Sequence, residues 1–217
     1  GCGPMGLGAV SYALAFENKP KRVVVTDISD DRVERAKQVI SIEDAKAAGV
    51  ELHYVNTAAM EDQEKELMDI TEGHGYDDVF VYVPITGVAE LGNKLLAYDG
   101  CMNLFAGPTD PKFSANMNLY DCHYSRTKIL GSTGGTIEDM KEAINKAASK
   151  EIKPAVMITH IGGIDAVAET TKNLPDIPGG KKLTYMQFDM PLTAIDDFRK
   201  LGETDPLYAK LADACDK

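Results

Sequence analysis

The residues best able to do chemistry stand at the start of the chain, which opens G-C-G-P-M-G-L-G. Gly1, Gly3 and Gly6 have the spacing G-x-G-x-x-G and lead directly into a stretch of helical period. Gly1 permits a tight turn, Gly3 lets a diphosphate approach the backbone, and Gly6 lets the helix lie close to a sheet. The anion then lies at the helix N-terminus, where peptide N–H groups point outward, with Pro4 and Met5 in the first turn. The pattern predicts dinucleotide binding, although flavin enzymes, methyltransferases and plain tight turns use similar loops.

An acidic residue strengthens this prediction. Asp27 ends an apolar stretch 21 residues after Gly6, and the dinucleotide fingerprint has an acid about 20 residues further on that binds the adenosine ribose hydroxyls. A carboxylate there repels a 2'-phosphate, so NAD(H) is preferred over NADP(H). Ser29 and Arg32 keep NADP(H) open as the alternative, because they could hold a phosphate if Asp27 turned away. Asp27 could instead cap the next helix, a role for which Asp30 competes.

The rest of the chain supplies the elements that must position these residues. Apolar runs rich in β-branched residues alternate with stretches of helical period, which is typical of repeated βα units. We expect an α/β fold with a Rossmann-type, doubly wound parallel sheet. Its strands are predicted at 22–26, 52–55, 78–83, 102–106 and 128–130, and its helices at 29–40, 61–72, 88–96 and 137–150. A turn is predicted at Asp99 and Gly100.

The order of these elements contains one gap. The fingerprint requires a strand before Gly1, and in the strand order 3-2-1-4-5-6 that strand lies at the centre of the sheet. Without it the neighbouring strands, 22–26 and 78–83, have no common partner, and a sheet cut through its middle is not expected to fold. We therefore expect the sequence to be a fragment of a longer chain.

Length and composition limit the other possibilities. The chain has 217 residues, of which 44% are hydrophobic, and a net charge of -11. That charge argues against nucleic acid as a partner, because nucleic-acid binders concentrate lysine and arginine on one face. No apolar run reaches the roughly 20 residues that span a bilayer, and we expect a cytoplasmic protein. Four scattered cysteines and four scattered histidines predict neither a disulfide framework nor a metal site.

The segment P-D-I-P-G-G at 175–180 is the best candidate for a boundary. We expect a dinucleotide-binding domain over 1–180 and a tail over 181–217 that packs onto something other than the nucleotide sheet. Short helices are expected in this tail near 194–201 and 207–214.

Several motifs resemble the cofactor domain of medium-chain, zinc-type alcohol and polyol dehydrogenases. They are G-C-G-P-M-G at the start, V-V-V-T-D ending at Asp27, Y-D-G-C-M-N-L-F-A-G at 98–107, K-I-L-G-S-T-G-G at 128–135 and I-T-H at 158–160. The resemblance covers essentially the whole chain. Within the family, M-P-L-T-A-I-D-D-F at 190–198 and L-G-E-T-D-P-L after it are most similar to L-sorbose 1-phosphate reductases and related sugar-phosphate or polyol dehydrogenases.

The resemblance implies an NAD(P)-dependent oxidoreductase and further cofactor-binding residues. It places Val83 and Pro84 along the adenosine half of the cofactor, Phe105, Ala106 and Gly107 beside the nicotinamide carboxamide, and Ser132 with Thr133 closing the nicotinamide side. Each of these is also an ordinary strand-end turn. They cluster where ligands of open α/β sheets bind, outside the carboxyl ends of the strands.

The resemblance also implies zinc, with its ligands and the proton relay in a separate domain upstream, to which the tail returns. No residue of this chain is therefore assigned to catalysis or to a metal. We expect a polyol, sugar or sugar phosphate as substrate and a homo-oligomer, dimer or tetramer, formed near 128–130. The alternatives are a zinc-free quinone reductase of the same superfamily and a nucleotide-sensing module with no catalysis of its own.

Overall fold

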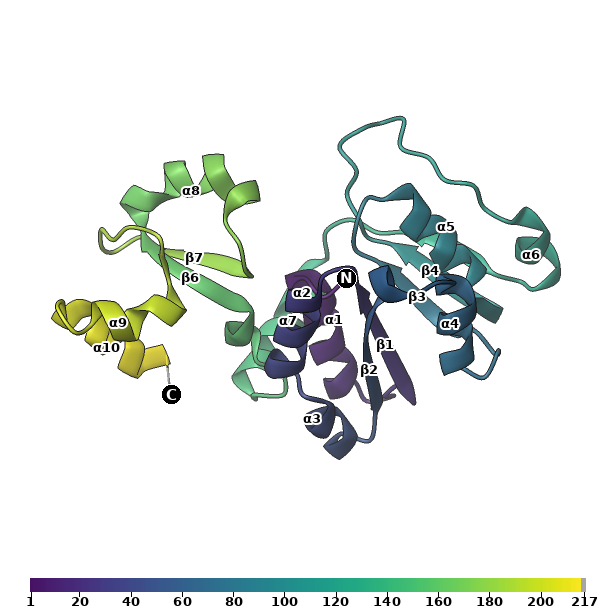
Figure 1. The fold of residues 1–217 in the computed structure, drawn as a ribbon, viewed down its shortest axis with the longest axis horizontal. Helices are drawn as coiled ribbons and strands as arrows, with labels where there is room; N and C mark the ends of the chain where they lie inside the picture. Colours follow the sequence, from purple (N-terminus) through teal and green to yellow (C-terminus); the bar gives the residue numbers. More distant parts are fainter. Residues whose placement is uncertain (216–217) are drawn as a thin grey trace. The chain divides into compact units, whose positions relative to one another are not determined.

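The structure, a computed structural model, describes residues 1–215 and has the predicted α/β fold, with parallel sheets flanked by helices (Figure 1). The chain divides into two compact units, Gly1–Glu151 and Ile152–Lys217. The predicted boundary near Gly180 falls inside the second unit, because strands on either side of it pair with each other. Among the residues described, every helix is too short or too polar to cross a membrane.

The first unit holds five strands and seven α-helices among the described residues. Its strands are β1 (Arg22–Asp27), β2 (Glu51–Asn56), β3 (Tyr76–Val81), β4 (Leu96–Leu104) and β5 (Lys128–Gly131). Its helices are α1 (Pro4–Ala15), α2 (Asp30–Val39), α3 (Ile42–Ala47), α4 (Gln63–Ile70), α5 (Thr86–Lys94), α6 (Leu119–Tyr124) and α7 (Ile137–Ala148), with a 3-10 turn, η1 (Thr57–Ala59). The sequence predicted all five strands, although β4 begins at Leu96 rather than at Met102, and it missed the short helices α3 and α6.

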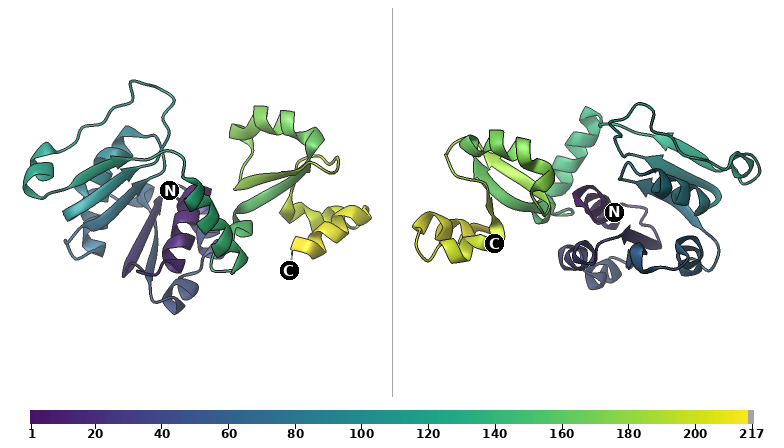
Figure 2. Two further views of the ribbon diagram at one scale, coloured as in Figure 1. Left: turned by 180° about the vertical axis from the view of Figure 1, so that it is seen from behind. Right: turned by 45° about the horizontal axis from the view of Figure 1, so that its top comes forward.

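The strands of this unit form two parallel sheets. The first has the order β1-β2, with Arg22 opposite Glu51 and Asp27 opposite Asn56. The second has the order β3-β4-β5 (Figures 1 and 2). No ladder joins β1 to β3 among the described residues.

The turn predicted at Asp99 and Gly100 is wrong. Both residues lie within β4, where the pairing with β3 shifts between Tyr76 opposite Leu96 and Asp78 opposite Cys101. Asp99 has φ +63°, and a Cβ on Gly100 would lie 2.9 Å from the carbonyl oxygen of Tyr76. The residues that suit a turn therefore form an irregularity inside a strand, of the kind that a β-bulge introduces.

Helix ends follow from the capping residues. Ser29 caps α2, because its hydroxyl accepts a hydrogen bond from Arg32 N, and Asp30 and Asp31 occupy the first turn, where acids suit the helix dipole. The helix predicted over 29–40 is thus confirmed, and its N-cap is Ser29 rather than Asp27 or Asp30. Thr136 begins α7 with a capping box, since its side chain and that of Asp139 each accept from the other's backbone N–H.

The second unit is a small α/β body. It contains β6 (Ile158–Gly163), β7 (Lys181–Tyr185) and β8 (Thr193–Ala194), in the order β7-β6-β8, with β8 antiparallel. Its helices are α8 (Val167–Asn173), α9 (Phe198–Leu201) and α10 (Pro206–Cys215), with 3-10 turns η2 (Pro154–Met157), η3 (Ile164–Ala166), η4 (Leu174–Asp176) and η5 (Ile195–Asp197). Figure 2 shows α8 on one side of the sheet and α9 and α10 on the other.

A compact apolar cluster holds this second unit together. Ile161, Met190, Phe198 and Ala212 are all buried in it. Phe198 is fully buried, and its ring lies 5.7 Å from that of Tyr208. Residues from β6, α9 and α10 thus share one core, which explains why the unit begins well before the predicted boundary.

Candidate cofactor site

The glycine loop enters α1 with Gly6 packed directly against the backbone of Gly1. A Cβ on Gly6 would lie 1.9 Å from the carbonyl oxygen of Gly1, so no other residue fits there. A Cβ on Gly3 would meet nothing within 4 Å, and the backbone of Gly3 is extended, with φ -72°. Nothing in the protein therefore requires glycine at position 3, which leaves the space above it open for a ligand.

The N-terminus of α1 lacks any side chain that could occupy an anion's place. Gly3 is the N-cap residue and makes no side-chain cap, Pro4 is the first helical residue, and the first turn contains no acid. Peptide dipoles give such a terminus a partial positive charge. The N-terminus of α1 therefore has no side-chain cap and no acid that would compete with a bound anion.

Asp27 lies directly beside this loop at the carboxyl end of β1. It is only 8% exposed. Its Oδ2 accepts a hydrogen bond of 2.8 Å from Cys2 N, and its Oδ1 accepts from Ile28 N at 2.9 Å and Ser29 N at 3.1 Å. A carboxylate offers about four acceptor sites, so one remains for a further donor. The acid predicted from the spacing is thus fixed against the glycine loop.

Asp27 does not take the alternative role of N-cap of α2. Ser29 is the N-cap of α2. Asp30, the competing acid, accepts from the Asn56 amide at 2.6 Å instead. Arg32 places Nη1 3.8 Å from Asp27 Oδ1, and its side chain is 65% exposed. A flexible guanidinium therefore lies within reach of the same carboxylate.

The predicted residues that follow β3 and β4 lie at the same carboxyl edge. A Cβ on Gly1 would lie 3.8 Å from Cγ1 of Val83, so Val83 contacts the loop, and Pro84 follows it at an exposed position. The N–H groups of Phe105 and Ala106 both donate to the carbonyl of Val81, at 3.1 and 3.0 Å. The turn after β4 is therefore tied to the end of β3.

Gly107 and the residues after β5 extend this edge. Gly107 is exposed, and a Cβ on it would meet nothing within 4 Å. Ser132 Oγ donates to Asn103 Oδ1 at 2.9 Å, and Ser132 N donates to the carbonyl of Leu104. Thr133 is exposed beside it. The structure therefore links Ser132 to β4, whereas it links Asp27 and Val83 to the glycine loop.

The sequence analysis missed Tyr82, which lies beside Gly6 of the glycine loop and packs against Phe105 in the turn after β4. A Cβ on Gly6 would lie 3.9 Å from Cδ2 of Tyr82. The Tyr82 ring lies 5.7 Å from that of Phe105 in an edge-on arrangement and 6.3 Å from that of Phe80, nearly parallel to it. The alternation of Phe80 and Tyr82 along one strand face was the available signal.

Two further features bear on chemistry at this site: the protonation of the Cys2 thiol and the grouping of possible metal ligands. Burial, together with the charge of Asp27, raises the pKa of the Cys2 thiol to about 11, so this cysteine stays protonated and is a poor nucleophile. Among the described residues, no three His, Cys, Asp or Glu side chains gather in a way that could hold a metal ion. The residues present therefore do not form a zinc site.

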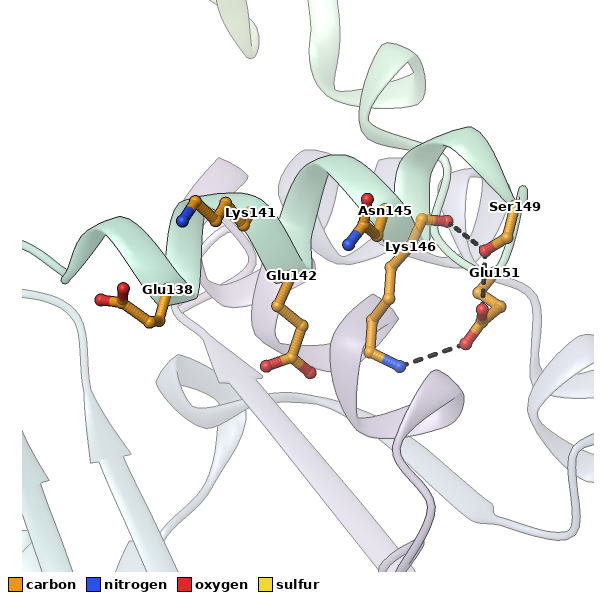
Figure 3. Close-up of a pocket in the computed structure, with 7 residues that line it drawn as sticks. All are labelled: Glu138, Lys141, Glu142, Asn145, Lys146, Ser149 and Glu151. Carbon is orange, nitrogen blue, oxygen red and sulfur yellow. Dashed lines mark hydrogen bonds and ion pairs between the residues drawn. The ribbon is translucent and has the colours of Figure 1, made fainter.

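A hollow of about 550 Å³ lies along α7, away from the predicted residues (Figure 3). Figure 3 shows that only polar and charged side chains line it, and Lys146 bonds Glu151 there at 3.1 Å. None of its residues follows the carboxyl end of a strand. We therefore place the candidate site at the glycine loop.

Comparison with known proteins agrees with this geometry. Residues 4–149 match the family described as zinc-binding dehydrogenase. The chain belongs to this family. Among curated relatives, mannitol-1-phosphate 5-dehydrogenase of Aliivibrio fischeri is 49% identical over 96% of the chain and 49% of its own length. L-sorbose 1-phosphate reductase of Klebsiella pneumoniae is 40% identical over 91% of the chain and 47% of its own length. The chain thus spans about half the length of these two relatives.

Solved structures of alcohol dehydrogenases share the fold. Benzyl alcohol dehydrogenase from Acinetobacter calcoaceticus has a TM-score of 0.68 at 16% identity, covering 84% of this chain and 47% of its own. An alcohol dehydrogenase from Escherichia coli CFT073, solved with NADH, has a TM-score of 0.62 at 19% identity, covering 81% of this chain and 47% of its own. The resemblance inferred from sequence motifs is therefore confirmed at the level of family and fold.

Proposed function

We propose that this chain is the cofactor-binding part of an NAD(P)-dependent oxidoreductase and that it prefers NAD(H). The observation that carries the proposal is the Asp27 carboxylate held against the glycine loop at Cys2 N. This contact fixes a ribose acceptor at a set distance from a helix N-terminus that has no side-chain cap and no acid in its first turn.

The same contact favours NAD(H) over NADP(H). Asp27 is buried, and a 2'-phosphate on the adenosine ribose would approach its charge in a partly desolvated place. Arg32, the nearest cation, lies 3.8 Å from Asp27 Oδ1 and neutralises part of that charge, which keeps the preference from being absolute. A ribose hydroxyl, in contrast, donates to the remaining acceptor site of the carboxylate.

The predicted residues along the carboxyl edge complete the site. A bound nicotinamide supplies or accepts a hydride at its ring. The loop from Gly1 to Gly6 holds the diphosphate, Val83 and Pro84 border the adenosine half, and the turn from Phe105 to Gly107 presents backbone groups to the nicotinamide side. Ser132 and Thr133 close that side. These residues bind and orient the cofactor, and none of them is assigned to proton transfer.

For the substrate, we propose a sugar phosphate or polyol. Support comes from the relatives named for mannitol 1-phosphate and L-sorbose 1-phosphate, which match 96% and 91% of the chain. Zinc would act as a Lewis acid in such a reaction, but no group of His, Cys, Asp or Glu among residues 1–215 could hold it. Our proposal for this chain is therefore restricted to the cofactor.

Fluorescence titration of the purified protein with NADH and with NADPH tests the proposal. We expect saturable binding of both, with NADH bound more tightly. No binding of either nucleotide would overturn the assignment. Incubation with a panel of polyols and sugar phosphates then separates an enzyme from a nucleotide sensor, because a sensor binds NADH without consuming it. Metal analysis of the active protein distinguishes a zinc enzyme from a zinc-free quinone reductase.

A further inference from the structure

Tyr82 lies beside the glycine loop and also packs against the turn after β4. Among the three atoms nearest to a Cβ on Gly6, two belong to the backbone of Gly1 and the third is Cδ2 of Tyr82. On its other side, the edge-on contact with Phe105 joins the Tyr82 ring to the turn that holds Ala106 and Gly107. No strand ladder connects these two parts of the unit among the described residues, since β1 and β3 belong to different sheets.

The ring is held firmly at this place. It is half-buried, and that burial raises the pKa of its hydroxyl. Phe80 stacks on it from the same face of β3, with ring planes 9° apart. The rings of Phe80, Tyr82 and Phe105 therefore form a continuous aromatic row, of which only the Tyr82 ring is placed against the glycine loop.

We propose that Tyr82 is a positioning residue that sets the spacing between the two halves of the cofactor site. This inference rests on the proposed function. A dinucleotide binds at both halves at once, with its diphosphate on the loop and its nicotinamide beside the turn after β4. A ring wedged between loop and turn fixes the distance that the ligand must span, and pre-organised spacing reduces the entropy lost on binding. Removal of the ring therefore affects ligands that span both halves more than ligands that occupy only the first.

The test compares two probes on the same variants. NADH spans both halves, whereas ADP-ribose contains the adenosine, the diphosphate and a ribose but lacks nicotinamide. For Tyr82→Ala we expect NADH affinity to fall about tenfold, the size of one aromatic contact. ADP-ribose affinity should stay within about twofold, and the fluorescence anisotropy of bound NADH should fall because the nicotinamide moves more freely.

Three further variants keep the test decisive. Tyr82→Phe retains the ring and should restore both affinities, and Tyr82→Leu serves if the alanine variant fails to fold. Tyr124→Ala is the matched control, because Tyr124 is 63% exposed on α6 and lies outside the aromatic row. We expect its two affinities to match those of the wild type.

The outcomes separate this inference from the proposed function. If the wild type binds neither probe, the proposed function fails. If the wild type binds both and Tyr82→Ala weakens them equally, or leaves both unchanged, only the positioning role is overturned. Selective loss of NADH affinity with rescue by Tyr82→Phe supports it.

Discussion

The carboxylate of Asp27 and the backbone N–H of Cys2 are joined by a hydrogen bond of 2.8 Å that spans 25 residues of sequence. This bond ties the end of β1 to the loop that begins α1. The other carboxylate oxygen is engaged by Ile28 N and Ser29 N, so the side chain cannot rotate without breaking contacts on both sides. A residue predicted as a ligand-binding acid is therefore also the anchor of the loop, and its substitution has two consequences that can be measured separately.

Asp27→Ser removes both the ribose acceptor and the charge that repels a 2'-phosphate. We expect NADH binding to weaken by about 1.5–3 kcal/mol, the size of a charge-assisted hydrogen bond. NADPH binding should weaken less or improve, because the repulsion is lost. Fluorescence titration with both nucleotides measures the ratio of the two affinities.

That ratio distinguishes the two roles of Asp27. Collapse of the loop alone would weaken both nucleotides equally and leave the ratio unchanged, which would count against the ribose role. Asp30→Ser is the matched control, because Asp30 carries the same charge three residues away and bonds Asn56 rather than the loop. Its ratio should equal that of the wild type.

The glycines of the first helix give a second prediction. Gly6→Ala places a Cβ 1.9 Å from the Gly1 carbonyl oxygen, so both the conformation of the loop and NADH binding should be lost.

In Gly3→Ala the added Cβ meets no protein atom within 4 Å. The free energy of unfolding should therefore change by at most about 1 kcal/mol, as for an N-cap substitution. NADH affinity should nevertheless fall about tenfold or more, because the methyl group occupies the approach of the diphosphate.

Gly8→Ala is the control for this pair. A Cβ on Gly8 also meets nothing within 4 Å, and Gly8 lies inside α1. Alanine there should stabilise the protein by about 0.5–1 kcal/mol and leave NADH binding unchanged. Thermal unfolding and titration measure the two effects. Retained NADH affinity in Gly3→Ala would argue that no ligand approaches that part of the backbone.

Local signals account for what the sequence predicted well. The spacing from Gly6 to Asp27 depends on one helix and one strand, and both are strongly patterned. The capping of α2 likewise depends on neighbouring residues, Ser29 and Asp30. The existence and order of the five strands of the first unit follow from short apolar runs, for which period and length suffice.

Features that depend on pairing between distant segments were missed. Asp99 and Gly100 suit a turn, but the pairing of Cys101 with Asp78 on one side and Lys128 on the other keeps the chain in a strand. The pairing of β6 with β7 likewise crosses the segment rich in proline and glycine at 175–180, and no local pattern indicates it. The contact of Tyr82 with the loop is likewise tertiary, because the alternation of Phe80 and Tyr82 indicates a shared face but not what that face meets.

His160 gives a prediction about pH. Burial and the charge of Lys182 lower the pKa of His160, while Asp196 and Asp197 oppose the shift. The unfolded chain therefore binds a proton more readily than the folded one, and the second unit should lose stability as the pH falls through about 6.5, the ordinary histidine pKa. Urea unfolding between about pH 5.5 and 7.5 measures this slope, above the range in which most carboxylates titrate.

His160→Gln should flatten that slope, since the group that titrates is gone. Thr159 Oγ1 lies 2.9 Å from His160 Nδ1, and a glutamine amide can still meet it. His123→Gln is the control, because His123 lies exposed on α6 in the other unit. An equal slope in the wild type and His160→Gln would show that other groups cause the pH dependence.

The last prediction concerns Lys182, whose ammonium donates hydrogen bonds to the segment 175–180, where the sequence predicts a domain boundary. Its Nζ donates to the carbonyl oxygens of Ile177 at 3.1 Å, Pro178 at 2.7 Å and Gly180 at 2.9 Å. Lys182→Met keeps the length of the side chain but leaves these carbonyls without their charged donor. We expect the free energy of unfolding of the second unit to fall by about 2 kcal/mol. Lys172→Met, at an exposed position of α8, should change it by less than about 0.5 kcal/mol.

Lys182→Met also removes a charge that lowers the pKa of His160, so the pKa of that imidazole, followed by NMR, should rise. Loss of stability without any rise in that pKa would mean that Lys182 acts on the loop alone, and no change in either would refute the role given to its ammonium.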